Sequence, residues 1–225
     1  LAFFGIEQFF GADDFADSYV FDAGSELSGV IYGGTGGPDT LVLQDDTAVG
    51  GYVPVNVSDA GSGTVEKFGY SITYDGIEPI ISGTSDHRLL YGTSLADAYQ
   101  ITTATTPGYL QVANKIGEFF DASDADPANH AVVAFLEFAE PTQELRIALG
   151  WGNDEVSVGE FITDTLSYAV VVDGGLDENI LLGADRGNIW KITSEDAGLL
   201  NEQLTFQNFY GLGGGTADDE FIFID

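Results

Sequence analysis

The chain has 225 residues and carries 37 acidic side chains against 6 basic ones, which gives a formal net charge of −31. Such a charge repels nucleic acid and anionic membrane surfaces, so neither is an expected partner. The absence of cysteine excludes disulfides, thiol catalysis and thiolate metal sites. No apolar run approaches the roughly 20 residues that span a bilayer, and we expect no membrane insertion.

The acidic composition has two interpretations, and both can hold at once. One is a surface adapted to saline surroundings, and the other is a carboxylate array that takes up divalent cations such as Ca²⁺. The high content of glycine, phenylalanine and tyrosine indicates a chain rich in strands and turns. The sequence begins at leucine rather than methionine, which predicts a processed chain or a segment cut from a longer protein.

Taken in chain order, the sequence alternates short apolar runs with glycine-rich turns. Residues 1–11 and 65–83 alternate weakly, residues 44–64 predict a loop with one short strand, and residues 121–130 are the most loop-like stretch. Residues 194–204 (SEDAGLLNEQL) predict at most one helical turn. The remaining strands are expected at residues 19–21, 40–43, 52–57, 99–103, 109–112, 132–138, 145–149, 156–158, 166–172, 180–182 and 190–193, with 99–103 and 109–112 forming a hairpin or two rungs.

The two ends of the chain resemble each other. Phe3, Ile6, Phe9 and Gly11 match Phe206, Phe209, Leu212 and Gly214 at an offset of 203, and Asp17, Tyr19, Val20 and Phe21 match Asp219, Phe221, Ile222 and Phe223 at an offset of 202. Such a match predicts about one period of a longer array. The residues expected to mediate contact between repeats are Phe3, Ile6, Phe9, Phe206, Phe209, Leu212, Phe221 and Phe223.

Many short strands separated by turns are typical of a sandwich, a barrel or a solenoid. The recurring glycine-aspartate corners and the matched termini favour an all-β parallel β-solenoid (β-helix), with a β-sandwich as the alternative. We expect residues 1–225 to form a single elongated domain. The open ends of such a rod need a neighbouring repeat or a cap. The matched termini favour the first alternative and predict head-to-tail assembly with copies of itself.

Three turns are similar to the glycine-aspartate nonapeptide that binds Ca²⁺ in β-rolls, at residues 33–41, 150–156 and 213–221. The first turn has an extra residue around Pro38, the second has Trp151 between its glycines, and the third lacks the second paired glycine. The alternative is a set of turns chosen for positive φ with solvated carboxylates. The candidate calcium ligands are Asp17, Asp39, Asp154, Asp218 and Asp219, and we expect no other cofactor.

Residues 190–223 (WKITSEDAGLLNEQLTFQNFYGLGGGTADDEFIF) resemble a recurring unit of giant bacterial surface proteins of the LEPR-XLL and RTX-adhesin kind, which carry hemolysin-type glycine-aspartate repeats. Further elements of that unit are similar to residues 1–10, 28–41, 72–79 and 138–158. The resemblance implies a structural repeat module of an extracellular or cell-surface adhesin, biofilm matrix protein or filament, often stiffened by calcium. Ala12, Phe15 and Trp151 depart from the pattern.

The alternative function is a β-helix that binds or cleaves polysaccharide, with surface glycans as partners. Carboxylate pairs serve glycoside cleavage, and the best local clusters are Asp121, Asp124 and Asp126 beside His130, and Asp86 with His87 and Arg88. Lyases of acidic sugars need cations, which this chain has in small number, and a solvated acidic loop explains the first cluster. The two histidines lack the spacing of a zinc site. We therefore expect no catalytic residues.

Overall fold

The computed structural model describes residues 7–22, 28–35, 39–44, 52–59, 62–67, 70–77, 80–83, 85–92, 96–116, 131–162 and 166–224. Within these ranges the chain forms strands and turns and no helix, which confirms the all-β prediction. Accordingly, no helix that could cross a membrane occurs in this part of the chain.

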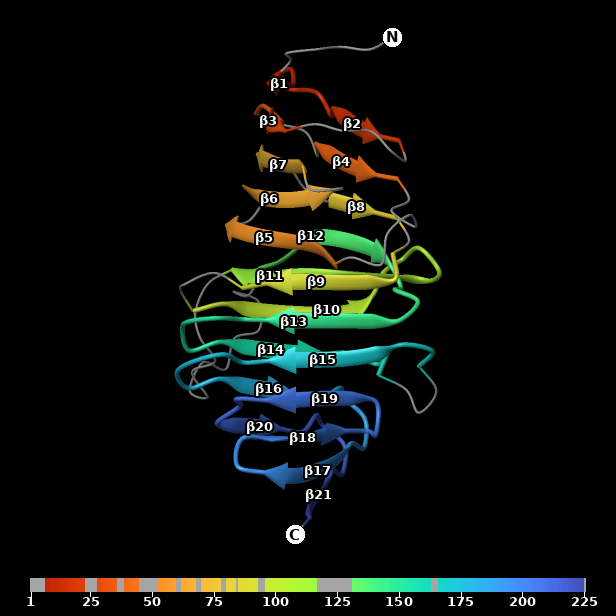
Figure 1. The fold of residues 1–225 in the computed structure, drawn as a ribbon, viewed down its shortest axis with the longest axis vertical. Coiled ribbons are helices and arrows are strands. Elements are labelled where there is room, and N and C mark those ends of the chain that lie inside the picture. Colours follow the sequence, from red (N-terminus) through yellow and green to blue (C-terminus); the bar gives the residue numbers. More distant parts are fainter. Residues whose placement is uncertain are drawn as a thin grey trace.

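The strands form two sheets that run side by side along an elongated stack, with the N-terminus at one end and the C-terminus at the other (Figure 1). The long sheet has 12 strands, and the short sheet has 9. The long sheet contains β1 (Gln8–Phe10), β3 (Gly29–Tyr32), β5 (Tyr52–Asp59), β6 (Ser62–Lys67), β7 (Tyr70–Asp75), β9 (His87–Tyr91), β13 (Glu144–Ala148), β15 (Ala169–Asp173), β17 (Ile189–Ser194), β18 (Ala197–Leu200), β19 (Leu204–Gln207) and β21 (Glu220–Phe223). The short sheet contains β2 (Ser18–Phe21), β4 (Thr40–Leu43), β8 (Ile80–Ser82), β10 (Ala98–Thr103), β11 (Tyr109–Ile116), β12 (Ala131–Ala139), β14 (Glu155–Val158), β16 (Ile180–Leu182) and β20 (Gly211–Gly213).

The chain crosses from one sheet to the other and back, and strands of successive passes pair in parallel. This pairing places like residues above one another. In the long sheet Leu90, Ile147, Val172 and Phe206 form one such row through β9, β13, β15 and β19, and all four side chains are buried. The core is therefore a column of apolar side chains between the sheets, and its burial is the main stabilising contribution of the fold.

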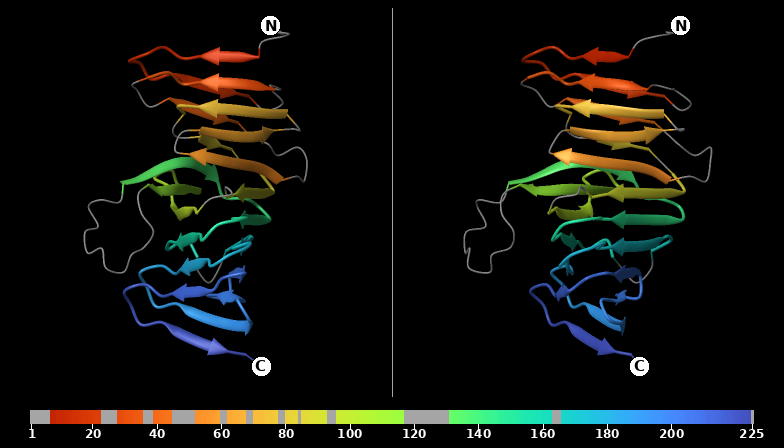
Figure 2. Two further views of the ribbon diagram at one scale, coloured as in Figure 1. Left: turned by 90° about the vertical axis from the view of Figure 1, so that its left-hand side faces the viewer. Right: turned by 60° about the vertical axis from the view of Figure 1, so that its left-hand side comes forward.

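Three antiparallel meanders interrupt the parallel order: β5–β6–β7 and β17–β18–β19 in the long sheet, and β10–β11–β12 in the short sheet. In each meander the last strand pairs with the preceding pass, and the first strand pairs with the pass that follows. At each meander the chain thus first moves three strand positions toward the C-terminal end of the stack. It then runs back toward the N-terminal end, strand by strand, until it pairs with the preceding pass (Figure 2).

Aromatic rings fill the column near its C-terminal end. Trp190 is buried, its ring meets Phe206 edge-on with centroids 5.8 Å apart, and Phe206 meets Phe209 at 6.4 Å in the same manner. Phe221 stacks on Trp190 at 5.8 Å with an interplanar angle of 3°. Such pairs add about 0.5–1.5 kcal/mol each to the area that the rings bury.

Several local expectations can be compared with the strands. The hairpin of residues 99–103 and 109–112 is confirmed as β10 and β11. The helical turn at 194–204 is wrong, because Asp196, Asn201 and Glu202 have positive φ and reverse the chain between β17, β18 and β19. The short strand expected at residues 52–57 is confirmed as β5, whereas the start of β6 also lies in the loop expected over residues 44–64.

Candidate functional site

The sequence motifs converge on the corners where the chain enters a strand. Seven aspartate or asparagine residues stand directly before a strand and share hydrogen bonds with one another between passes, and we call these side chains the corner residues. They are Asp17 before β2, Asp39 before β4, Asp97 before β10, Asp154 before β14, Asn179 before β16, Asn188 before β17 and Asp219 before β21. Asp86 before β9 and Asp196 before β18 also precede strands but do not join this set.

Corner residues of neighbouring passes are joined by hydrogen bonds along the stack. The N–H of Asp17 donates to Oδ1 of Asp39 at 2.8 Å. The N–H of Asp97 donates to Oδ1 of Asp154 at 2.8 Å, and the N–H of Asp154 donates to Oδ1 of Asn179 at 2.9 Å.

The same bond runs from the N–H of Asn188 to Oδ1 of Asp219, at 2.9 Å. In all four cases the donor lies on the pass nearer the N-terminus, and the acceptor lies on the next pass toward the C-terminus. The corner ladder therefore has a direction, with acceptors facing the N-terminal end and donors facing the C-terminal end.

A glycine makes room for each of several corner side chains. A Cβ on Gly33 would lie 2.7 Å from Oδ2 of Asp39 and 2.1 Å from the carbonyl oxygen of Gly76. A Cβ on Gly92 would lie 2.8 Å from Oδ2 of Asp97. These distances are too short for any residue with a side chain. The same relation links Gly11 to Asp17, Gly174 to Asn179, Gly183 to Asn188 and Gly214 to Asp219.

Asp154 is the corner residue with the most perturbed carboxyl group. Its side chain is 1% exposed, and its Oδ2 is buried without a hydrogen-bond partner. Burial raises the pKa of Asp154 to about 7, the N–H from Asp97 opposes this, and the nearby carboxylates of Asp97 and Asp177 raise the pKa further. This group therefore titrates near neutral pH.

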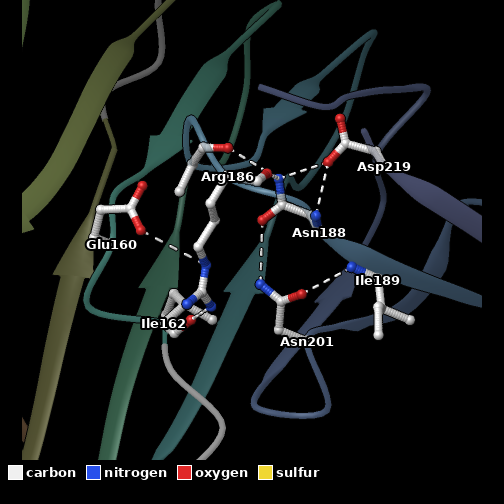
Figure 3. A network of polar contacts seen from close by, with 8 residues as sticks. Glu160, Ile162, Arg186, Asn188, Ile189, Asn201 and Asp219 are labelled. Carbon is white, nitrogen blue, oxygen red and sulfur yellow. Dashed lines mark hydrogen bonds and ion pairs between the residues drawn. The ribbon is translucent and has the colours of Figure 1, made fainter. Parts of the chain in front are cut away.

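At the C-terminal end the corner residue Asn188 is fully hydrogen-bonded (Figure 3). Its Nδ2 donates to the carbonyl oxygens of Ala184 at 2.9 Å and Arg186 at 2.7 Å, and to Oδ1 of Asp219 at 2.7 Å. Its Oδ1 accepts from Nδ2 of Asn201 at 3.2 Å. The amide therefore fixes the turn before β17 and links it to β21.

Asn201 extends this network across the meander. Its Oδ1 accepts from the N–H of Ile189 at 2.8 Å. On the other side Arg186 reaches the carbonyl oxygen of Ile162 and lies 3.7 Å from the carboxylate of Glu160. Together these contacts satisfy the side-chain amides of Asn188 and Asn201 and tie the turn before β17 to its neighbours.

The structure brings only some of the candidate calcium ligands together. Asp17 and Asp39 are neighbours in one ladder, Asp154 lies in another with Asp97, and Asp219 lies at the C-terminal end beside the exposed Asp218. Four of the five therefore act as hydrogen-bond acceptors for backbone N–H groups. In the described ranges, no three acidic or histidine side chains are grouped as a metal site would require. Calcium binding stays a prediction.

The residues expected to contact neighbouring repeats divide into three groups. Phe206 and Phe209 are buried and contact this chain's own core, whereas Phe9 and Leu212 are half-buried against the core. Phe221 and Phe223 are 43% and 78% exposed at the C-terminal end. Phe3 and Ile6 lie outside the described residues.

The candidate catalytic clusters are also placed in part. Asp121, Asp124, Asp126 and His130 lie outside the described residues. Asp86 accepts a hydrogen bond from the hydroxyl of Thr142. Arg88 is buried, donates to the carbonyl oxygen of Gly83 at 2.8 Å, and lies 5.3 Å from the ring centre of Phe138. These contacts give Asp86 and Arg88 structural roles.

Sequence reasoning missed the corner roles of Asp97, Asn179 and Asn188, and the part that Asn201 takes in the network around Asn188. The signal for the first three was present, because each follows a glycine by five positions and directly precedes an apolar strand. These turns differ from the calcium-binding nonapeptide. Asn179 and Asn188 stand where that motif has aspartate, and the turn before Asp97 has the single glycine Gly92 in place of paired glycines.

Comparisons of this chain with protein-family models, with curated proteins and with solved structures found no match. The functional argument therefore depends on the geometry of the chain itself.

Proposed function

We propose that this chain is a structural repeat module of an extracellular bacterial adhesin, matrix protein or filament, folded as a parallel β-solenoid that assembles head to tail. The observation that carries the proposal is the corner ladder. Hydrogen bonds join corner residues of neighbouring passes at four places along the stack, and all four run in the same direction. A surface module that must hold its shape over a long distance needs such repeated axial contacts.

The interior supports a structural role for the same reason. The space between the sheets is filled by a column of buried side chains, including Trp190, Phe138 and Phe206. Polar groups with perturbed pKa values can mark catalytic clefts when they converge. Burial and the carboxylates of Asp97 and Asp154 raise the pKa of Tyr99, so Tyr99 and Asp154 lie near each other, but both side chains are buried within the filled stack. A filled column of this kind gives the module stability and an elongated shape.

The net charge of −31 supports an extracellular, saline or cation-rich setting, because salt and divalent ions reduce the repulsion among the carboxylates. Calcium bound between acidic corners would stiffen the module further. Within this proposal surface glycans are targets of the whole assembly, and the module itself is the spacer that presents the binding parts.

The experiment uses antibodies raised against this chain. We expect them to label intact, unpermeabilised cells that make the protein, and to detect either a band far larger than 23.8 kDa on a denaturing gel or a ladder of assembled copies on a native gel. Labelling that requires cell lysis would overturn the extracellular assignment. A band at the mass of this chain, with no larger assembly under native conditions, would overturn the assignment as a repeat module.

A further inference from the structure

The two ends of the stack are complementary, and this extends the proposed head-to-tail function. We infer that the partner at each end is a second copy of this chain, rotated by half a turn about the stack axis, with its β1 paired in parallel to β20 and its β2 paired in parallel to β21. The inference rests on the proposed function and adds the register and the rotation.

The sheets end in strands with one unpaired edge. Among the described strands β1 and β2 are the last at the N-terminal end, and β21 and β20 are the last at the C-terminal end (Figure 1). An open parallel edge presents backbone N–H and C=O groups that favour pairing with another strand. Each end therefore offers two edges, one in each sheet.

The corner ladder ends with an open donor at one end and an open acceptor at the other. By the direction of the ladder, the N–H of Asp219 points toward the next pass, and it has no hydrogen-bond partner among the described residues. At the N-terminal end Oδ2 of Asp17 accepts the N–H of Ala12 at 2.7 Å. Its Oδ1, the atom that accepts at Asp39, Asp154 and Asp219, has no partner in the part of the chain that the structure describes. A second copy would join this donor to this acceptor.

The ladder also sets the register. Wherever two corner residues are joined, the first residues of their strands are paired, as Ser18 is with Thr40 and Ile189 is with Glu220. Joining Asp219 to Asp17 of the second copy therefore pairs Glu220 with its Ser18. The next pairs are Phe221 with Tyr19, Ile222 with Val20, and Phe223 with Phe21 of that copy.

This register covers aromatic side chains that are now open at the ends. Phe221 stacks on the buried Trp190 and so faces the column, and Phe223, two residues on, lies on the same face of β21. Tyr19 and Phe21 also pack against the core, from the other end. Docking would continue the aromatic column through Trp190, Phe221 and Tyr19 of the second copy, and would bury the ring of Phe223, which is 78% exposed.

The half-turn follows from the sheets to which these strands belong. Strand β2 lies in the short sheet, whereas the matching strand β21 lies in the long sheet. The next open position after β21 along the chain path lies under β20. A copy rotated by half a turn places its β1 under β20 and so fills this position. A copy docked without rotation would place its β1 under β21 and leave the position under β20 empty. The half-turn therefore gives continuous pairing.

Both ends are acidic, and this determines the conditions for docking. Asp13 and Asp14 lie beside the Asp17 corner, and Asp218 and Glu220 lie beside the Asp219 corner. The Debye length falls from about 10 Å at 0.1 M salt to about 3 Å at 1 M salt. We therefore expect association to strengthen as salt or Ca²⁺ is added.

Disulfide cross-linking tests the register, because the native chain contains no cysteine. Val20→Cys in one preparation and Ile222→Cys in another change outward positions that the half-turn register aligns. Aligned residues on neighbouring strands lie about 4.8 Å apart, within the range in which a disulfide forms. The matched control mixes Phe10→Cys with Ile222→Cys, because Phe10 on β1 would approach β21 only without the rotation.

We expect the first mixture to form a mixed disulfide dimer at high salt under mild oxidation, and the control mixture to form none above the level of single-variant preparations. Cross-linking of the control mixture alone would overturn the half-turn and leave the proposed head-to-tail function intact. If neither mixture cross-links and native mass measurement finds only monomer, the inference and the head-to-tail function both fail. Surface labelling tests the extracellular role separately.

Discussion

The substitution Asp154→Asn isolates the energetic effect of the buried corner carboxyl group. Oδ1 of the asparagine would still accept the N–H of Asp97, and its amide nitrogen would replace Oδ2, which has no partner. Asn179 occupies the next corner of the same ladder and shows that an amide fits, since its Nδ2 donates to the carbonyl oxygens of Leu176 at 3.0 Å and Asn208 at 3.2 Å. The substitution therefore removes the charge while it keeps the ladder.

The magnitude follows from the raised pKa. Burial holds the pKa of Asp154 at about 7 in the folded chain, whereas an aspartate in an unfolded chain has a pKa of about 3.9. The folded chain retains a proton that the unfolded chain has lost, so stability falls as pH rises through this interval and levels off above it. At 1.36 kcal/mol per pH unit the full interval corresponds to about 4 kcal/mol, of which about 2.5 kcal/mol falls between pH 5 and pH 8.

Urea unfolding at pH 5, 6, 7 and 8, followed by tryptophan fluorescence, measures this difference. We expect Asp154→Asn to gain about 2.5 kcal/mol relative to the native chain between pH 5 and pH 8. Asp218→Asn removes an exposed charge near another corner and serves as the control, which should remain within about 0.5 kcal/mol of the native chain. Parallel pH profiles for the native chain and Asp154→Asn would refute the reasoning.

Three further outcomes can be measured by thermal or urea unfolding. Gly33→Ala should lower the free energy of unfolding by about 1–3 kcal/mol, because its Cβ would overlap the corner at Asp39. Gly211→Ala should be nearly neutral, because the nearest atom to its Cβ is in the flexible side chain of Ile180, at 3.3 Å. Equal effects of the two substitutions would contradict the corner interpretation. Asn188→Ala should cost about 3 kcal/mol, because it leaves buried carbonyl groups unpaired, and a loss below about 1 kcal/mol would show that water replaces the amide. If the acidic corners bind calcium, Ca²⁺ should raise the melting temperature by several degrees over that in EDTA, and identical melting curves would contradict a calcium site.

The sequence was sufficient to predict the class of the fold and many of its strands. Apolar runs of three to five residues between glycine turns correspond to β4, β14 and β16, because each strand follows a glycine turn and a corner residue, Asp39, Asp154 or Asn179. The match between the termini also has a counterpart in the structure, since β1 and β2 correspond to β20 and β21.

The antiparallel meanders could not be predicted in the same way. Local alternation in residues 65–83 or 99–112 is equally compatible with an antiparallel neighbour and with a parallel one, because both present the same faces to the core. What distinguishes them is which distant strand pairs with each edge, as when β5 pairs with β9 and β7 pairs with β3. That information lies in contacts between passes and not in any single segment.

The candidate site was predicted at the level of residue type, and its role at the corners was not. Asp39, Asp154 and Asp219 were selected because they follow glycine turns. At Asp39 and Asp219 a glycine of that turn lies directly against the carboxylate. The spacing of one turn cannot show that the acceptor for an N–H is the corner of the next pass, 22 residues away for Asp17 and 57 for Asp97.

Sedimentation velocity of the native chain over a range of concentrations, at low and high salt, tests most directly whether these modules associate end to end. We expect mass and frictional ratio to rise together, because end-to-end association makes longer particles, and we expect Phe223→Glu to abolish the association. Trp151→Glu is the matched control, since Trp151 is 64% exposed away from both ends, and it should associate as the native chain does. A native chain that stays monomeric at high salt, or whose frictional ratio falls as dimers form, would contradict the account.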